Sequence, residues 1–298
     1  MKRHYVGTVD DSKFATPKMY QPHSAKYTRL SLLDHTTTPA TVHTGLSLAQ
    51  FEPGGYLNPV VHAFEKGFYV LRGAIIATID GRTYKLPQDY YGVIPMGVTY
   101  SMYNAGSEPA RLLEMMAPQP KPEDGNFKDT FFHKDGAGQV VKDGDLPDLN
   151  DPRVAKHLGR FEESQLGAPG EISAVGARGG SIYGISLKEF IDRMLGAEHL
   201  AMFMVQFRPG GMGTQHDHAL EESYFILSGE AETILDGNTY HVKAGDYVWT
   251  GVGCMHSFEN IGDVPVRWIE TQAPLPTQTQ AFRFRREWEP LAKKIEGE

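Results

Sequence analysis

The most informative stretch of the chain runs from Gly210 to Gly229 and reads GGMGTQHDHALEESYFILSG. It follows a proline, places two histidines two residues apart, and continues into a run of β-forming residues. Side chains at positions i and i+2 of a strand point to the same face, so we expect His216 and His218 to share one face. Glu222 keeps this parity and reaches the same face if the strand continues that far. The stretch therefore predicts a polar cluster on one face of a β structure.

A second copy of this region lies 156 residues earlier (210 − 54). The sequence QFEPGG at 50–55 matches QFRPGG at 206–211, and DGRTY at 80–84 matches DGNTY at 236–240. Matches of this length at one spacing indicate an internal duplication. Each copy alternates short runs of Val, Ile, Tyr, Phe and Thr with turn residues, and each has an Asp-Gly pair that predicts a tight hairpin. We therefore expect an all-β protein made of two similar sandwiches, jelly rolls or barrels.

The composition is that of an ordinary globular protein, with 298 residues of which 40% are hydrophobic and 22% charged. This length fits about two domains. The formal net charge of −8 provides no basic surface for nucleic acid or an anionic membrane. No apolar stretch approaches the ~20 residues of a membrane span, and we find no secretory signal. The single cysteine, Cys254, excludes an intrachain disulfide and a multi-cysteine zinc site, so we expect a cytoplasmic protein.

The repeats define the expected domain organisation. We place a first barrel with an N-terminal arm at 1–120, a connector at 121–197, and a second barrel with a charged tail at 198–298. Apolar residues at helical spacing over 186–195 predict one amphipathic helix in the connector. We expect the arm to pack on the other copy or on a partner subunit. The tail at 283–298 is expected to be solvated and to contain a short helix.

Four side chains of the second copy are candidate metal ligands: His216, His218, Glu222 and His256. His256 belongs to a separate strand, which closure of the barrel would bring near the others. Three neutral imidazoles and a carboxylate suit one divalent first-row metal and leave a coordination position free, as in catalytic sites. Because no sulfur ligand is present, Fe(II), Mn(II), Zn, Ni and Co are all compatible with this set, and we favour Fe(II) or Mn(II).

The spacing of these residues resembles the cupin superfamily. The first cupin motif, G-x5-H-x-H-x3,4-E-x6-G, is matched at every position from Gly210 to Gly229. The second, G-x5-P-x-G-x2-H-x3-N, is matched from Gly245 to Asn260, except that Gly251 replaces the proline. The resemblance covers about 42–120 and 198–276. It implies two tandem jelly-roll barrels with a few short helices in the connector and tail, and a metal held inside the second barrel.

The first copy has lost most of the ligand set. Val60, His62, Lys66 and Tyr100 stand where the four candidate ligands stand in the second copy. A lysine ammonium repels a metal ion, so we expect His62 to be an interior histidine and this barrel to be a structural partner. Its cavity, lined by the three polar side chains, could still hold an organic ligand.

Three further residues are candidates for the walls of the pocket: Arg267, Tyr224 and Trp249. An inward Arg267 would pair with a substrate carboxylate. However, Arg111 occupies the same place in the first copy, which favours a structural role shared by both. Tyr224 and Trp249 could equally belong to the aromatic core. Cys254 is expected to be a small buried hydrophobic residue.

Three functions are compatible with a metal site of this kind. The first is an Fe(II)- or Mn(II)-dependent oxidoreductase of the dioxygenase type acting on a small polar or aromatic organic acid. The second is Mn-dependent aminohydrolase or related Lewis-acid chemistry, because the layout is similar to ureidoglycine aminohydrolases, although their ligand pattern (E-x-H-x3-H with a later Gln) differs from this one. The third is a non-catalytic cupin that binds a small ligand. All three imply a small-molecule partner, and a homodimer is left open.

Overall fold

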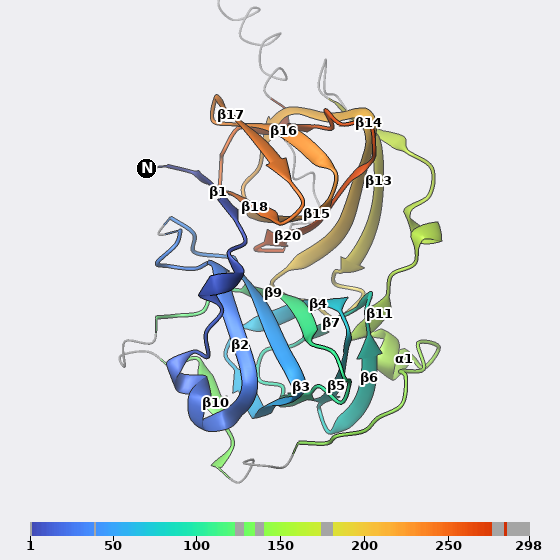
Figure 1. Cartoon of the computed structure of the whole chain (residues 1–298). Helices are drawn as coiled ribbons and strands as arrows, with labels where there is room; N and C mark the ends of the chain where they lie inside the picture. Colours follow the sequence, from blue (N-terminus) through green and yellow to red (C-terminus); the bar gives the residue numbers. More distant parts are fainter. Residues whose placement is uncertain are drawn as a thin grey trace, which may run out of the picture. The chain divides into compact units, whose positions relative to one another are not determined.

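The computed structural model describes residues 2–38, 40–122, 128–134, 140–173, 181–275 and 283–284. The chain forms two compact units, each built around one sequence repeat (Figure 1). The unit with the first repeat, here the first barrel, contains Asp10–Glu162 and Phe190–Ala201. The unit with the second repeat, here the second barrel, contains Met1–Val9, Glu163–Glu189 and Met202–Glu298.

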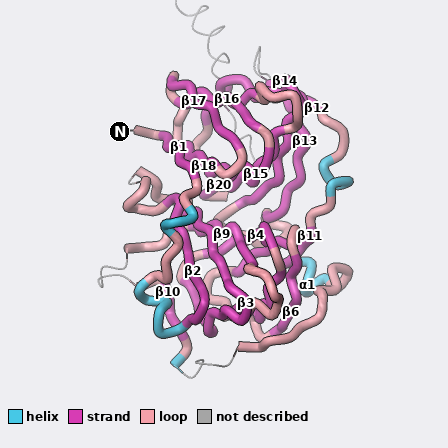
Figure 2. The backbone as a smooth tube through the Cα atoms, viewed as in Figure 1, coloured by secondary structure: helices cyan, strands magenta, loops and turns pink. Residues whose placement is uncertain are grey.

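The first barrel is a barrel-like sheet in the order β11-β7-β4-β9-β3-β8-β5-β6, to which β2 and β10 add by pairing with β3. Its strands are β2 Ser24–Leu33, β3 Gly45–His62, β4 Glu65–Arg72, β5 Ala74–Ile79, β6 Arg82–Pro87, β7 Tyr90–Ile94, β8 Tyr100–Tyr103, β9 Ala110–Ala117, β10 Thr130–Phe132 and β11 Leu158–Arg160. The described helices are short: η1 Asp11–Lys13, η2 Lys18–His23 and α1 Pro152–Ala155. Strands therefore dominate this unit (Figure 2).

The second barrel repeats this order as β1-β18-β15-β20-β14-β19-β16-β17. Its elements are β1 His4–Thr8, η4 Glu163–Leu166, β12 Gly170–Ser173, β13 Ser181–Ile191, β14 Ala201–Asp217, β15 Glu221–Ser228, β16 Glu230–Leu235, β17 Asn238–Lys243, β18 Asp246–Thr250, β19 His256–Glu259, β20 Val266–Ala273 and β21 Arg283–Phe284. The two orders correspond position by position, with β11 and β1 at equivalent ends. The prediction of an all-β protein with two tandem barrels is confirmed.

Both predicted Asp-Gly hairpins are present, between β5 and β6 and between β16 and β17. All four turn residues have positive φ: 49° at Asp80, 74° at Gly81, 47° at Asp236 and 81° at Gly237. This backbone conformation matches the right-handed twist of the flanking strands, and Asp and Gly tolerate it better than other residues. The turns therefore fix the register of the two hairpins.

Each barrel has its own apolar core, formed by the side chains that point inward from alternate strand positions. The core of the second barrel includes Phe207, Tyr224, Phe258 and Trp268, which are 2–5% exposed. The rings of Phe258 and Trp268 lie 5.2 Å apart. This aromatic packing supports the interior face on which the polar cluster lies.

The prediction of an amphipathic helix over 186–195 is wrong. Residues 181–191 form strand β13, and turns follow it. The apolar residues of the helical pattern do not share one buried face, because Leu187 is 41% and Met194 is 85% exposed while Phe190 is 2% exposed. Strand β13 pairs with both β12 and β14, so neighbouring strands supply its backbone hydrogen bonds.

The two ends of the chain were expected to be an arm and a solvated tail. The start of the arm does pack on the other copy, since β1 pairs with β18 in the second barrel. The rest of the arm packs on its own copy, where β2 pairs with β3. In the tail, the two residues of β21 pair with β14, and the expected helix beyond 284 lies outside the described residues.

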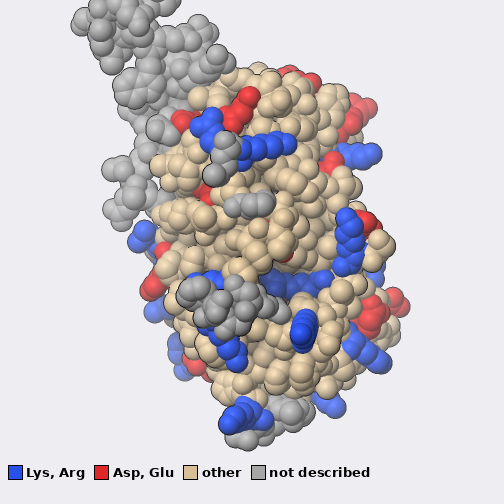
Figure 3. Space-filling view, turned by 90° about the vertical axis from the view of Figure 1, so that its left-hand side faces the viewer, with Lys and Arg blue, Asp and Glu red and all other residues tan. Residues whose placement is uncertain are grey.

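Charge is mixed on the face of the molecule that Figure 3 shows. Basic and acidic side chains both occur on the face shown in Figure 3, in keeping with 29 Lys and Arg against 37 Asp and Glu in the chain. Within the described part of the chain, no helix combines the length and the apolar character that crossing a bilayer would need.

Candidate metal centre

Three imidazoles and one carboxylate meet inside the second barrel. His216 lies at the end of β14, His218 in the turn that follows, Glu222 in β15, and His256 at the start of β19. All four are 1–7% exposed. The three histidines offer ligand atoms within 4.8 Å of one another, and Glu222 Oε2 lies 2.9 Å from His218 Nε2 and 3.3 Å from His256 Nε2. The structure therefore brings together all four side chains predicted as metal ligands.

The three histidines are held in the same tautomer by the backbone. In each one, Nδ1 lies at hydrogen-bond distance from a carbonyl oxygen two residues away. The distances are 2.7 Å from His216 to Thr214, 2.9 Å from His256 to Cys254, and 3.3 Å from His218 to Leu220. Because a carbonyl only accepts, Nδ1 carries the proton and donates it in each case. Each Nε2 is therefore the ring atom left for a metal, which is how a histidine is prepared to bind one.

The donor set fits a divalent cation. The buried Nε2 of His256 has no hydrogen-bond partner among the described residues. Burial and the neighbouring His256 lower the pKa of His216 to about 3, so this imidazole is neutral and its lone pair is available. Lone pairs that face one another in a buried site cannot satisfy each other, whereas a cation accepts all of them.

The carboxylate of Glu222 is oriented by two neighbours. Tyr224 donates its hydroxyl proton to Oε2, and Gln272 Nε2 donates to Oε1 over 2.8 Å. Burial alone would raise the pKa of Glu222, but His218 and His256 hold it well below its ordinary value. The group is therefore an anion whose position is fixed by hydrogen bonds, as is common for carboxylates that bind metals.

A cavity of about 320 Å³ borders this cluster directly and touches His216, Glu222 and His256. Its remaining walls are mainly apolar and aromatic: Ile182, Ile185, Leu187, Phe203, Val205, Phe207, Phe258 and Trp268. Among the described residues that line it there is no lysine or arginine, and the charged ones besides Glu222 are Glu189 and Glu270. The pocket is thus apolar with acidic positions, and it offers no cationic side chain to an anionic substrate.

Glu270 is a pocket residue whose role was not anticipated from sequence. Its carboxylate accepts hydrogen bonds of 3.1 Å from both Trp268 Nε1 and Gln272 Nε2. Burial, followed by the charge of Glu222, raises its pKa. The available signal was the parity of 268, 270 and 272 along β20, which places all three toward the pocket.

The candidate Arg267 does not line the pocket. Its Nε donates to Gln206 over 3.1 Å, and its Nη2 donates to Glu163 over 2.7 Å. The equivalent Arg111 bonds Gln50 in the same way, with a distance of 2.7 Å from Nη2. Since Arg267 has opposite strand parity to the pocket residues beside it, it lies on the other face of β20. The structural role shared by both copies is the one observed.

Of the two aromatic candidates, Tyr224 lines the pocket and Trp249 does not. Trp249 is opposite Ser223 in the β15–β18 ladder, whereas Tyr224 is opposite Val248. The indole therefore lies on the other face of the sheet, where Nε1 donates to Glu221 Oε2 over 3.3 Å. Trp249 is 2% exposed and serves packing.

In the first barrel, a buried ion pair occupies the equivalent place. Lys66 Nζ donates to Tyr100 Oη over 2.7 Å and to Glu114 Oε1 over 2.9 Å. His62 Nε2 lies 2.9 Å from the same tyrosine oxygen, and its Nδ1 lies 3.0 Å from Thr130 Oγ1. All of these side chains are 1–3% exposed. The expectation that His62 is a satisfied interior histidine is confirmed, and the polar groups at this position bond one another.

Comparison with known proteins agrees with this architecture. Residues 47–116 and 203–271 each match the Cupin domain family. Together with the two barrel-like sheets of equal strand order, these matches support a bicupin layout, with one cupin domain in each barrel.

Among curated proteins, the chain is similar to (S)-ureidoglycine aminohydrolase of Escherichia coli strain K12, with 25% identity over 199 residues. The match covers 66% of this chain and 62% of that enzyme, so it spans somewhat less than two thirds of the relative's length. Among solved structures, it is similar to oxalate decarboxylase of Lactobacillus farciminis, with a TM-score of 0.63, 16% identity, and coverage of 93% of this chain and 91% of that chain. The Bacillus subtilis oxalate decarboxylase gives a TM-score of 0.60 and 17% identity, covering 91% and 78%. At these identities the structural likeness shows a shared fold.

Proposed function

We propose that the second barrel is the active site of a metal-dependent oxidoreductase of the dioxygenase type, acting on a small aromatic compound that binds the metal through oxygen. The observation that carries this proposal is the aromatic pocket of about 320 Å³ that opens directly on the three histidines and Glu222 and has no cationic side chain among its described lining residues. An enzyme is preferred over a passive binding protein because such a ligand set leaves coordination positions free.

Four residues would hold the metal: His216, His218 and His256 through Nε2, and Glu222 through Oε2. Nitrogen and oxygen donors without sulfur suit Fe(II) or Mn(II), which are the ions we favour. When bound, such an ion supplies a Lewis acid with open positions at which a substrate oxygen and O₂ can be brought together. The chain's own contribution is to keep His216 neutral, to direct the Nε2 atoms of all three histidines to one place, and to keep the carboxylate ionised and oriented.

The walls of the pocket determine which substrates fit. Phe207, Phe258 and Trp268 offer flat apolar surfaces to an aromatic ring, and the volume is at the small end of the range for ligand pockets. A small dianion held by ion pairs would lack partners, because the described lining carries only acidic charged residues. The polar anchor for the substrate is therefore the metal, and one aromatic ring with one or two oxygen substituents is the size expected.

The overall reaction is balanced without a further redox partner. A dioxygenase adds both atoms of O₂ to its substrate, and the substrate supplies all four electrons that reduce O₂. Neither an external reductant nor an organic cofactor is needed. The apolar walls exclude water from the reacting centre, which limits competing hydrolysis.

A second candidate is hydrolytic or lyase chemistry with the metal as a Lewis acid. Two observations favour it: Glu270 stands in the pocket with a raised pKa, and a curated relative is named as an aminohydrolase. A carboxyl group that keeps its proton near neutral pH could deliver it to a leaving group and take it back afterwards. In this case, no O₂ would be consumed.

The two candidates are separated by measuring oxygen uptake and metal content together. The purified chain, loaded anaerobically with Fe(II) or with Mn(II), is offered catechols, hydroxylated aromatic acids and keto acids. We expect one Fe(II) or Mn(II) per chain, bound at this centre, and one O₂ consumed per substrate. His218→Ala should lose both the metal and turnover, whereas His62→Ala, the matched change in the first barrel, should retain both.

Turnover under anaerobic conditions with release of ammonia or CO₂ would instead establish the second candidate. If His218→Ala retained full metal content and full turnover, the assignment of the site itself would be wrong.

A further inference from the structure

A second cluster of metal-binding side chains lies in the second barrel, distinct from the four residues described above. It consists of His4 in β1, Asp236 in the turn between β16 and β17, and Cys254 in the segment before β19. Each offers one ligand atom, and the three atoms lie within 4.8 Å of one another. Neither the expected function nor the pocket makes use of these residues.

One ring nitrogen of His4, Nδ1, is buried and has no hydrogen-bond partner among the described residues. The side chain is 3% exposed, and its Nδ1 has no hydrogen-bond partner among the described residues. This atom lies 3.9 Å from Asp236 Oδ2, beyond hydrogen-bond distance. The other nitrogen, Nε2, lies 3.0 Å from Tyr240 Oη. Histidines that bind metals have this arrangement, with one nitrogen on the ion and the other hydrogen-bonded to a neighbour.

Cys254 is the only cysteine of the chain and is 1% exposed. Its sulfur makes one weak contact, a distance of 3.9 Å to the carbonyl oxygen of Met255. No second thiol exists with which it could form an intrachain disulfide. The residue therefore places a soft donor beside a nitrogen and a carboxylate.

Asp236 supplies the third donor and the route to solvent, since its side chain is 21% exposed. Oδ1 accepts from Arg3 Nη2 over 2.9 Å and from the Met255 backbone over 3.1 Å, while Oδ2 accepts from Arg3 Nε over 3.1 Å. A carboxylate oxygen has two lone pairs, so Oδ2 keeps one for an ion on the side of His4.

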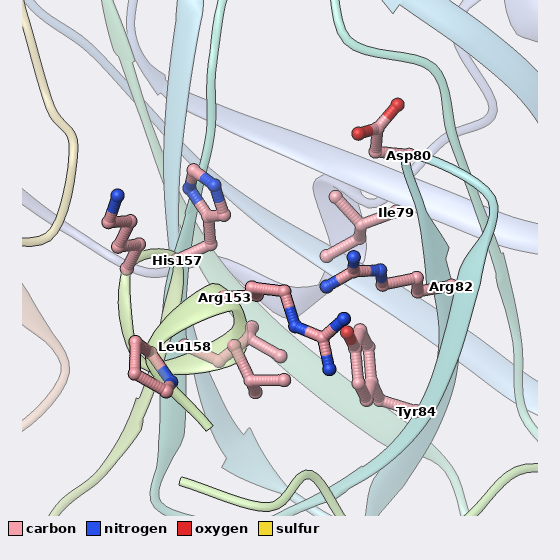
Figure 4. Close-up of a pocket in the computed structure, with 10 residues that line it drawn as sticks. Ile79, Asp80, Arg82, Tyr84, Arg153, His157 and Leu158 are labelled. Atoms are coloured by element: carbon pink, nitrogen blue, oxygen red, sulfur yellow. The ribbon is translucent and has the colours of Figure 1, made fainter. Parts of the chain in front are cut away.

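The first barrel provides an internal comparison. There β11 takes the place of β1, and Asp80 and Val98 are the counterparts of Asp236 and Cys254. Gly159 is opposite Tyr91 as Gly7 is opposite Tyr247, so the counterpart of His4 is Lys156, and His157 is the next residue along. The Nδ1 of His157 is also buried without a partner among the described residues, so the histidine alone does not distinguish the two barrels. Figure 4 shows Asp80 and His157 on different sides of a pocket of about 310 Å³.

What distinguishes the second barrel is therefore the thiol and the convergence of the three donors. Among the described residues, no three-residue group of this kind includes the first-barrel counterparts.

We propose that His4 Nδ1, Asp236 Oδ2 and Cys254 Sγ bind a divalent ion of the zinc type, with water in the fourth position. Nitrogen, oxygen and sulfur donors together suit Zn²⁺ or Co²⁺, which accept four ligands in tetrahedral geometry. On binding, the thiol loses its proton to solvent, and the thiolate and the carboxylate, which also pairs with Arg3, offset most of the charge of the ion. The ion would join β1 to the β16–β17 turn and to the segment before β19.

Co²⁺ is the probe that tests this site, because a thiolate bound to Co²⁺ absorbs in the near ultraviolet. The cluster of His216, His218, Glu222 and His256 contains no sulfur, so it cannot produce this band. We expect His218→Ala, titrated with Co²⁺, to show the band at one equivalent. In the same background, Cys254→Ser should lack it, and His4→Ala should bind Co²⁺ at least about tenfold more weakly. His157→Ala, which removes the first barrel's own buried histidine with an unpartnered Nδ1, should leave the titration unchanged.

Absence of the band at saturating Co²⁺, in protein shown to be folded by circular dichroism, would overturn the proposal. A band of equal affinity in His4→Ala would also overturn it, because the thiol would then be binding Co²⁺ with other partners. Both results are independent of whether the oxidoreductase activity exists.

Discussion

At the scale of single residues, the two barrels compensate a buried charge in different ways. In the first barrel, Lys66 places an ammonium next to Glu114 and Tyr100 in the interior. In the second barrel, the equivalent position is Glu222, whose charge is compensated by histidines and, in our proposal, by a metal ion. A buried charge needs a partner in either case, so these residues are not interchangeable one at a time.

The ion pair of the first barrel can be tested by removing its cation. Lys66→Met leaves Glu114 buried with Arg29 Nε, 3.4 Å away, as the remaining cation. Removing one partner of a buried pair is strongly destabilising, so we expect the free energy of unfolding to fall by about 3 kcal/mol in urea denaturation at neutral pH. The double variant Lys66→Met/Glu114→Gln should recover part of this loss. A single variant as stable as the parent would contradict the role given to Lys66.

The pH dependence of stability follows from Glu114. Burial would raise its pKa, but Lys66 and Arg29 outweigh burial and hold the pKa below its ordinary value. The unfolded chain therefore binds this proton more readily than the folded protein does. The contribution of Glu114 to the free energy of unfolding is fully present above the ordinary pKa of about 4.3, and it is lost as the pH falls below that value. We expect the difference in unfolding free energy between the parent and Glu114→Gln to shrink between about pH 6 and pH 3. A difference that does not change with pH would contradict the lowered pKa, because it would mean that the carboxyl binds its proton equally well in the folded and the unfolded states.

The four side chains at the candidate metal centre were predictable from sequence because their spacing along the strands specifies their direction. His216 and His218 have the same parity, and the ladder places His256 directly opposite His216. The residues that surround these four ligands were harder to predict from sequence. Gln272 and Glu270 lie 48 or more residues from Glu222 (270 − 222) and reach it only through pairing of β15 with β20, which a local pattern does not contain.

At the scale of elements, the tight turns could be predicted because the residues that form them are recognisable in the sequence. The Asp-Gly pairs at 80–81 and 236–237 predicted two hairpins, and both form. The pattern at 186–195 was misleading because a short apolar run is compatible with a strand or a helix, and pairing with β12 and β14 decides between them. Local rules therefore succeed where backbone geometry is restricted and fail where partners determine the structure.

Gly237 offers a direct measure of this backbone restriction. Its φ is 81°, and a Cβ built on it would meet nothing within 4 Å. Gly237→Ala should therefore destabilise the protein by about 1 kcal/mol, through backbone conformation alone. Gly237→Asn should cost less, because asparagine tolerates positive φ. Equal unfolding free energies for the parent and the alanine variant, measured in urea, would show that the turn relaxes to another type.

At the scale of the whole molecule, duplication gives two units with one strand order and two different interiors. This arrangement predicts that metal affects them unequally. Both described tryptophans, Trp249 and Trp268, are in the second barrel, and the first repeat contains none, so tryptophan fluorescence reports unfolding of the second.

Removal of metal with a chelator should lower the unfolding temperature seen by fluorescence. An ion at a hundred times its dissociation constant stabilises the folded state by about 2.7 kcal/mol, and that contribution is lost with the ion. With Fe(II) or Mn(II) as the ion supplied, His62→Ala should show the same response to the chelator as the parent, whereas His218→Ala should respond much less. An unchanged fluorescence transition in the parent would indicate that the second barrel holds no stabilising metal.

Strand β1 completes the second barrel by pairing with β18, and His4 is opposite Thr250 across 246 residues of chain (250 − 4). Closing so long a loop is entropically costly, and contacts between residues far apart in sequence form slowly. We therefore expect this edge to be completed late in refolding, after the strands around it have found their order. A fusion partner or tag attached near residue 4 would then disturb the second barrel, although most of that barrel is formed by residues after 163.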